Sequence, residues 1–166
     1  MERSGKIGIG CFETISVLGK GTYGTVLLVR YIKTRKLYAM KVVRKIKNKK
    51  KKEKQRKFIL NEKNVLIKMK NSQWIVQVKW TFQTSKKLYF VMEYCPGGEL
   101  FNLLVKYRKF KEETAKFYVA QIVLAIEELH SRDVIYRDLK PENVIIAADG
   151  YIKLTDFGLS KIHGQN

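Results

Sequence analysis

The hydrophobic pattern divides the chain into a first part typical of strands and a second part typical of helices. Short runs rich in Val, Ile, Tyr and Leu occupy residues 12–18, 25–31, 37–43, 75–80 and 88–92, and Gly-rich or polar segments separate them. Runs of this length, bounded by turn-forming residues, are typical of β-strands. The first part of the sequence therefore predicts a β-meander.

Helical periodicity appears at residues 58–69 and dominates after residue 98. The first of these segments has the spacing i, i+4, i+7, i+8 and i+11, which marks the core-facing stripe of a helix. The stripe consists of Phe58, Glu62, Val65, Leu66 and Met69. The Pro96-Gly97-Gly98 turn then ends the strand pattern, and helices are predicted at 100–106 and 111–130. The predicted fold class is α+β, with a β-rich part that precedes a helical part.

Two charged residues fall on faces that the pattern predicts to be buried. The period of two in residues 37–43 places Ala39, Lys41 and Val43 on one face of a strand, and Glu62 interrupts the apolar stripe of the first helix. Each charge would be costly to bury alone, so an ion pair between Lys41 and Glu62 is the simplest solution. In the alternative interpretation, Glu62 lies at the edge of the stripe and turns toward solvent.

Composition is that of a globular, intracellular domain. The 166 residues are 45% hydrophobic, which is enough for a buried core, and the two cysteines, Cys11 and Cys95, give no disulfide framework. No apolar run approaches the roughly 18 residues of a membrane span, and the N-terminus lacks a signal-peptide core. We expect a cytoplasmic location, with the nucleus as a second expected compartment.

The net charge of +19 is concentrated in part in residues 45–57, which hold nine Lys or Arg residues and one acid, Glu53. The chain shows no zinc-ligand spacing, no aromatic RNA-binding signature and no basic region before a leucine zipper, so no specific nucleic-acid partner is expected. Two interpretations of the run remain open. It is either a solvated surface segment or a patch that recognises acidic partners or anionic lipids.

A glycine-rich stretch lies between the first two predicted strands. Gly19, Gly21 and Gly24 allow backbone amides to approach phosphates without obstruction from side chains. A dinucleotide-binding fingerprint would require a helix directly after the glycines, and a Walker A loop would require a closing Gly-Lys-Ser or Gly-Lys-Thr. Neither is present, so the stretch predicts either a phosphate-binding hairpin of another kind or a plain hairpin turn, and the residues that follow it favour the phosphate-binding hairpin.

Residues suited to phosphoryl transfer follow in the second part. Asp138, Lys140 and Asn143 fall within six residues beside Pro141, and Asp156 precedes Phe157-Gly158. A carboxylate can orient a hydroxyl and accept its proton, a lysine can offset charge on a transferred phosphate, and amide or carboxylate oxygens can bind Mg²⁺. The order and spacing of these groups after the glycine-rich stretch indicate a phosphotransferase.

These motifs together make the chain resemble a eukaryotic serine/threonine protein kinase of the AGC group, the relatives of cAMP-dependent kinase and protein kinase B. The resemblance runs from about residue 12 to residue 161. Tyr136 stands where most kinases have the histidine of the His-Arg-Asp motif, a change that is frequent in this group. Residues 92–100 and 154–161 are also similar to the sequences typical of the group. A protein-kinase-like fold follows as an expectation. It has a complete β-rich N-lobe and the first part of a helical C-lobe, and the chain is truncated after the Asp-Phe-Gly motif.

The resemblance implies specific roles in ATP binding. Adenine would lie between Leu18, Val26, Ala39 and Ile145, with Met92 as gatekeeper and the backbones of Glu93 and Cys95 bonded to the base. The glycines of the hairpin, Gly19, Gly21 and Gly24, would cover the phosphates. Lys41 would hold the α- and β-phosphates and pair with Glu62, in agreement with the pattern of buried faces.

The resemblance also implies the catalytic and substrate residues. Asp138 would be the catalytic base, Lys140 a γ-phosphate contact, and Asn143 and Asp156 the Mg²⁺ ligands. Glu99 would bind the ribose and a substrate arginine, and Glu142 would bind a second arginine. The expected activity is ATP-dependent phosphorylation of Ser or Thr in proteins that carry basic residues upstream of the acceptor.

The sequence contains no Ala-Pro-Glu tripeptide and no complete activation loop after Gly158. Two functions therefore stay open: an active protein kinase, and a truncated nucleotide-binding regulatory or decoy module without efficient catalysis. The expected organisation is an N-terminal extension at 1–11, an N-lobe at 12–94, and the hinge with a partial C-lobe at 95–166.

Overall fold

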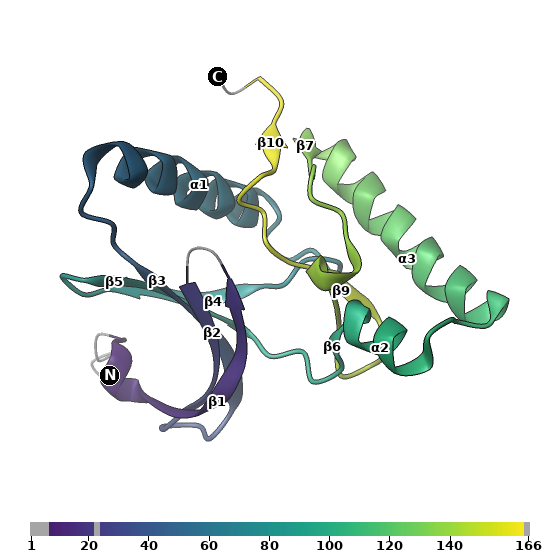
Figure 1. The fold of residues 1–166 in the computed structure, drawn as a ribbon, viewed down its shortest axis with the longest axis horizontal. Coiled ribbons are helices and arrows are strands. Elements are labelled where there is room, and N and C mark those ends of the chain that lie inside the picture. Colours follow the sequence, from purple (N-terminus) through teal and green to yellow (C-terminus); the bar gives the residue numbers. More distant parts are fainter. Residues whose placement is uncertain (1–6, 22–23, 165–166) are drawn as a thin grey trace, which may run out of the picture. The chain divides into compact units, whose positions relative to one another are not determined.

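The computed structural model describes residues 7–21 and 24–164. Residues 1–6 of the predicted N-terminal extension lie outside the described residues. The chain forms two compact units (Figure 1). The first contains the described residues up to Lys52 together with Val78–Tyr94, and the second contains Glu53–Gln77 together with the described residues from Cys95 onward.

The first unit is built on a five-stranded antiparallel sheet with the strand order β1-β2-β3-β5-β4 (Figure 1). A short 3-10 helix, Ile9–Cys11, precedes the sheet. The strands are β1 (Phe12–Gly21), β2 (Gly24–Tyr31), β3 (Leu37–Arg44), β4 (Val78–Gln83) and β5 (Lys87–Glu93). The β-meander predicted for the first three runs is confirmed.

Side chains on one face of this sheet form an apolar cluster that includes Phe12, Val29, Met40, Tyr89 and Val91. Three residues of β3, Tyr38, Met40 and Val42, contact this cluster. Because successive side chains of a strand point to opposite faces, Ala39, Lys41 and Val43 lie on the other face. The predicted shared face of Ala39, Lys41 and Val43 is confirmed.

The second unit combines three helices with short strands (Figure 1). The helices are α1 (Lys49–Lys68), which begins within the first unit, α2 (Leu100–Tyr107) and α3 (Glu112–Ser131). The strands are β6 (Gly98–Glu99), β7 (Val134–Ile135), β8 (Val144–Ile146), β9 (Ile152–Leu154) and β10 (Lys161–Ile162), and a 3-10 turn covers Pro141–Asn143. The sheets have the orders β6-β8-β9 and β10-β7. All three predicted helices are present.

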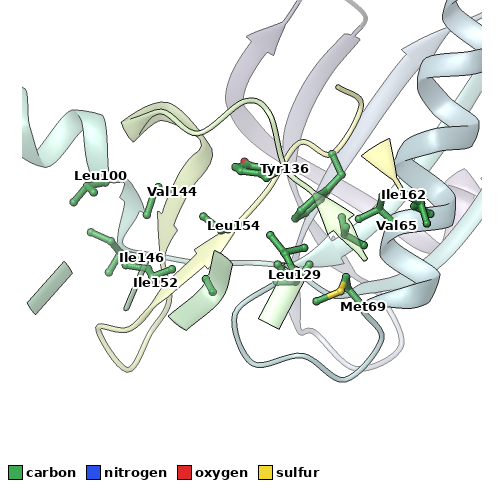
Figure 2. Close-up of a cluster of buried hydrophobic side chains, with 14 residues drawn as sticks. Val65, Met69, Leu100, Leu129, Tyr136, Val144, Ile146, Ile152, Leu154 and Ile162 are labelled. Carbon is green, nitrogen blue, oxygen red and sulfur yellow. The ribbon is translucent and has the colours of Figure 1, made fainter. Parts of the chain in front are cut away.

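A second apolar cluster forms the core of this unit (Figure 2). Figure 2 shows Val65 of α1, Met69 directly after it and Leu129 of α3 in this cluster, together with Leu154 of β9 and Ile162 of β10. Partly buried side chains from one face of α3, such as Tyr118 and Ile122, pack against it. The core thus joins segments that are distant in the sequence.

Several predicted boundaries are wrong: β1 and β4 extend to Gly21 and Gln83, beyond the predicted residues 18 and 80, and two elements begin elsewhere than predicted. Helix α1 begins at Lys49, inside the basic run, because lysine, glutamate and glutamine are good helix formers and Asn48 accepts a hydrogen bond from the Lys51 amide at 3.3 Å. Strand β4 begins at Val78 and not at residue 75, because Ile75 and its neighbours bond to Leu154 of the second unit. The apolar pattern alone does not reveal this change of partner.

Glu62 is 4% exposed, although it is charged. The alternative in which this side chain turns toward solvent is therefore wrong. Its predicted ion pair with Lys41 joins residues of different units and stays a prediction.

Candidate active site

The glycine-rich hairpin is formed by β1 and β2, with Gly21 opposite Gly24. A methyl group on Gly19 or Gly21 would have no heavy atom within 4 Å, so the space beside these two residues is open. A methyl group on Gly24 would lie 2.1 Å from the carbonyl oxygen of Val42. Gly24 is therefore required for packing of β2 on β3, whereas the other two glycines leave room for a ligand.

Strand register gathers the predicted adenine and phosphate residues of the first unit. Val26 of β2 lies opposite Lys41 of β3, and Ala39 lies opposite Met92 of β5. Leu18 lies at an irregularity of β1 next to Gly19 and is 43% exposed. Antiparallel partners have their side chains on the same face, so Val26, Ala39, Lys41 and Met92 are neighbours on one side of the sheet.

The predicted hinge follows β5. Glu93 is the last residue of β5, and Cys95 is buried and belongs to no disulfide. The carbonyl oxygen of Cys95 accepts a hydrogen bond from the Gly98 amide at 3.3 Å, which closes the turn before β6. The roles predicted for the Glu93 and Cys95 backbones in base binding stay predictions.

In the second unit, Asp138 is held by the two residues that the sequence pairs with it. Lys140 Nζ lies 3.1 and 3.0 Å from the two carboxylate oxygens of Asp138. Asn143 Nδ2 donates to Asp138 Oδ2 at 2.8 Å and to its carbonyl oxygen at 2.9 Å. The structure thus brings the predicted catalytic base together with the predicted phosphate contact and one predicted metal ligand.

The β8–β9 ladder brings the second predicted metal ligand to the same place. Asn143 directly precedes β8, and Asp156 follows β9 by two residues. Val144 pairs with Leu154, and the Thr155 amide donates to the Asn143 carbonyl oxygen at 3.0 Å. Asn143 and Asp156 therefore lie at the same end of the ladder. Asp156 has a positive φ of 58°, an uncommon conformation for a residue other than glycine in which aspartate is enriched.

The charges of this site shift the pKa values of two neighbours. The hydrogen bond to Asp138 is the main cause that raises the pKa of Lys140, and the negative charges of Asp138, Asp156 and Glu142 add to it. Burial raises the pKa of Tyr136, and the nearby charges of Asp156 and Asp138 raise it further. Lys140 therefore keeps its positive charge, and Tyr136 stays a neutral hydrogen-bond donor.

Glu99 and Glu142 form an acidic pair beside this site. Glu99 of β6 lies opposite Ile145 of β8, and Glu142 belongs to the 3-10 turn that precedes β8. Burial and the negative charge of Glu142 raise the pKa of Glu99. A cationic group placed between these carboxylates would relieve their mutual repulsion.

Three residues outside the predicted set of site residues support the site. Tyr136 is buried, and its hydroxyl donates to the Thr155 carbonyl oxygen at 2.5 Å. Asn61 of α1 donates to the carbonyl oxygen of Phe157, next to Asp156, and the Ser160 hydroxyl donates to the carbonyl oxygen of Tyr136. An asparagine in a helix and a serine after a turn are usually surface residues, so composition and periodicity give no signal for these two.

No group of three or more His, Cys, Asp or Glu side chains that could hold a metal ion occurs within the described ranges 7–21 and 24–164. In the same ranges, no helix has the length and apolar character needed to cross a membrane.

Comparison with known proteins gives one family and many relatives. A family model described as "Protein kinase domain" matches residues 12–166. The chain is 48% identical over 150 residues to serine/threonine-protein kinase Sgk1 of Danio rerio, an alignment that covers 90% of this chain and 34% of the relative. It is 45% identical over 160 residues to a RAC family serine/threonine-protein kinase homolog of Dictyostelium discoideum, which covers 96% of the chain and 35% of the relative.

A third relative, serine/threonine-protein kinase SCH9 of Saccharomyces cerevisiae, is 49% identical over 152 residues, which is 90% of the chain and 18% of the relative. The chain thus spans about a third or less of the length of these relatives. The resemblance to serine/threonine kinases of the AGC group and the predicted protein-kinase-like fold are confirmed by these matches.

Proposed function

Because the chain belongs to the protein kinase domain family, we propose that it carries the ATP-binding and phosphotransfer residues of a protein serine/threonine kinase. The observation that carries the proposal is the arrangement around Asp138. Its carboxylate is bonded to Lys140 and Asn143, and the β8–β9 ladder places Asp156 at the same end of the sheet as Asn143.

In the proposed reaction, Asp138 orients the Ser or Thr hydroxyl of a protein substrate and accepts its proton. The ammonium of Lys140 offsets the charge that develops on the transferred γ-phosphate, which its raised pKa supports. Open space beside Gly19 and Gly21 suits close approach of backbone amides to phosphates. Lys41, opposite Val26 in the sheet, is the proposed contact of the α- and β-phosphates.

The donor set fits Mg²⁺ as the metal that accompanies ATP. Mg²⁺ prefers oxygen ligands and is usually bound by one or two protein ligands together with phosphate oxygens and water. Asp156 supplies a carboxylate. Asn143 uses its Nδ2 for both hydrogen bonds to Asp138, so its amide oxygen is the group suited to a metal. Bound Mg²⁺ would neutralise phosphate charge, and Asn143 and Asp156 would hold it.

The proposal is tested by phosphate transfer from labelled ATP to a Ser-containing peptide with upstream arginines. The variants Asp138→Asn and Asp156→Asn should each lower the rate by at least about 100-fold, and EDTA should abolish it. Asp149→Asn is the matched control, because this exposed aspartate lies in the turn between β8 and β9 and its acceptor role toward the Tyr151 amide is retained by asparagine. ATP binding without transfer would favour the regulatory or decoy module.

Basic peptides are the proposed substrates. The acidic pair Glu99 and Glu142 is suited to guanidinium groups, since arginine forms strong charge-assisted hydrogen bonds with carboxylates. Peptides with arginine upstream of the acceptor should have a lower KM than the same peptides with glutamine there. Equal KM values for the two series would reject this preference.

An anionic partner is proposed for the basic run. The side chains of Lys49, Lys50, Lys51 and Lys52 are exposed in the first turn of α1, which contains no acid. Lysines are unfavourable at the positive end of a helix dipole, and an acidic protein or anionic lipid would relieve this cost. Replacement of the four lysines by glutamine should weaken binding to vesicles containing phosphatidylserine or to an acidic peptide. Unchanged binding to both would favour a merely solvated segment.

A further inference from the structure

One side chain of helix α1 forms several hydrogen bonds to the chain that follows Asp156. Asn61 Nδ2 lies 3.1 Å from the carbonyl oxygen of Phe157, 3.2 Å from that of Gly158 and 2.5 Å from that of Ser160. Asn61 and all three acceptors belong to the second unit. One amide group with two hydrogens thus serves three carbonyl oxygens within four consecutive residues, a concentration of contacts that fixes the path of this segment.

Phe58 adds an apolar contact between the same two elements. A methyl group on Gly158 would lie 1.8 Å from Cζ of Phe58, so the phenyl ring occupies the space that a side chain at this position would need. Phe58 and Asn61 are three residues apart in α1, and residues at this spacing lie on one face of a helix. This face of α1 therefore packs on the backbone of residues 157–160 and bonds to it.

Tyr136 and Arg137, which directly precede Asp138, form further contacts with the same segment. Arg137 Nε donates to the Leu159 carbonyl oxygen at 2.7 Å, and the Ser160 hydroxyl donates to the Tyr136 carbonyl oxygen at 3.0 Å. On the other side of Asp156, the Thr155 carbonyl oxygen accepts from the Tyr136 hydroxyl. Asp156 thus lies between two stretches of backbone that are fixed by side-chain hydrogen bonds.

We propose that Asn61 is a positioning residue that holds the Asp156 carboxylate in the orientation needed to bind Mg²⁺ with ATP. The Asn61 amide group donates to backbone oxygens of the segment and not to the Asp156 side chain, so in this proposal it acts indirectly, through the position of Asp156. The inference rests on the proposed kinase function, because the orientation of Asp156 toward Mg²⁺ matters only in a protein that binds ATP with this metal. If Asn61 is released, Asp156 loses one restraint on its C-terminal side, the bonds to Phe157 and Gly158 nearest to it. The Arg137 and Ser160 bonds further along and the Tyr136 contact on its N-terminal side remain.

The test compares Asn61→Asp and Asn61→Leu in the full-length protein with the matched controls Asn64→Asp and Asn64→Leu. Asn64 is an exposed residue of the same helix, three positions further along, so each pair carries the same chemical change. Aspartate replaces the donor by a charged acceptor that the three carbonyl oxygens repel. Leucine removes the donor with little change in size and no added charge.

For each variant, the affinity for a fluorescent ATP analogue is measured in EDTA and in saturating Mg²⁺, and the ratio of the two Kd values is compared. A ratio taken within one variant does not depend on the fraction of folded protein. We expect Asn61→Asp to lower the stimulation of binding by Mg²⁺ about tenfold, which corresponds to about 1.4 kcal/mol, and Asn61→Leu to lower it less. Affinity in EDTA and the Asn64 variants should be unchanged.

Hydrogen exchange gives a second readout that needs no nucleotide. The amides of residues 157–160 should exchange faster in the Asn61 variants and at the wild-type rate in the Asn64 variants. A wild-type Mg²⁺ ratio in both Asn61 variants would overturn the positioning role, even if exchange increased. Absence of Mg²⁺-stimulated binding in the wild-type protein itself would instead reject the proposed function, so the two failures are distinguishable. If Asn61→Asp does not fold, Asn61→Leu decides the question.

Discussion

Replacement of Gly158 by alanine should destabilise the second unit because the new methyl group would overlap the ring of Phe58. The Cβ atom would lie 1.8 Å from Cζ and 2.1 Å from both Cε1 and Cε2 of that ring. Non-bonded carbon atoms are comfortable at about 3.5–4.0 Å, so a displacement of about 1.5–2 Å is required. Overpacking of this kind costs about 1–3 kcal/mol. Gly158 does not have a positive φ, so the cost is steric and not conformational.

The chain offers one tryptophan reporter for each unit. Trp74 packs against the apolar cluster of the second unit, and Trp80 packs against that of the first. These are the two tryptophans of the 166-residue chain. In a Trp80→Phe background, urea denaturation followed by the fluorescence of Trp74 therefore measures the free energy of unfolding of the second unit. The transition of the Gly158→Ala variant should move to lower urea concentration.

A smaller side chain at position 58 should remove most of this cost. In the Phe58→Leu background, Gly158→Ala should be at least about 1 kcal/mol less destabilising than in the wild-type background, as expected for residues in direct contact. Gly19→Ala, at a position with open space and no positive φ, is the control and should change stability by less than about 0.5 kcal/mol. An equal cost of Gly158→Ala in both backgrounds would refute the packing of α1 on this segment.

Three further predictions concern the residues around Asp138. Tyr136→Phe should lower the stability of the second unit by about 1–2 kcal/mol in the same urea assay, because the hydrogen bond to Thr155 is lost while the ring contact with Phe157, 5.1 Å between centroids, remains. Lys140→Met should lower kcat by about 100-fold. Asp138 raises the pKa of Lys140, so Lys140 stays protonated at pH values above the ordinary lysine pKa. The contribution of this positive charge to the wild-type kcat should therefore persist to those pH values and disappear only at higher pH. Burial and Glu142 raise the pKa of Glu99, so Glu99 takes up a proton at higher pH than an ordinary glutamate. The KM for an arginine-containing peptide should therefore rise as the pH falls through that raised pKa, and Glu99→Gln should give a high KM that no longer varies with this ionisation.

Periodicity predicted the longer helices and strands, in which one face is buried over several helical turns or several strand residues. The shared face of Ala39, Lys41 and Val43 and the burial of Glu62 follow from spacing alone, because one side of each element packs on a core. Strands β7, β8 and β10 contain only two or three residues, too few for a period to be recognised. They exist because backbone partners distant in the sequence complete them.

The residues proposed for the chemistry could be predicted from the sequence, whereas Asn61, which holds the backbone beside them, could not. Asp138, Lys140 and Asn143 are close in sequence, so their contacts follow from the local turn. The role of Asn61 depends on the path that the chain takes after Gly158, almost 100 residues later. No local pattern encodes a hydrogen bond from a helix to the backbone of a later loop, and this contact could be found only in the three-dimensional structure.

One small sheet sets the positions of the predicted metal ligands and of an acidic residue proposed for substrate binding. In the order β6-β8-β9, Glu99 lies on β6, Asn143 directly precedes β8, and Asp156 follows β9. A shift of one residue in the β8–β9 register would turn the alternating side chains to the opposite face and move Asn143 away from Asp156. The buried pair Val144 and Leu154 resists such a shift, since both side chains contribute to the second core. The hydrophobic core of this unit therefore acts directly on the chemistry, because it fixes the register on which the distance between the two metal ligands depends.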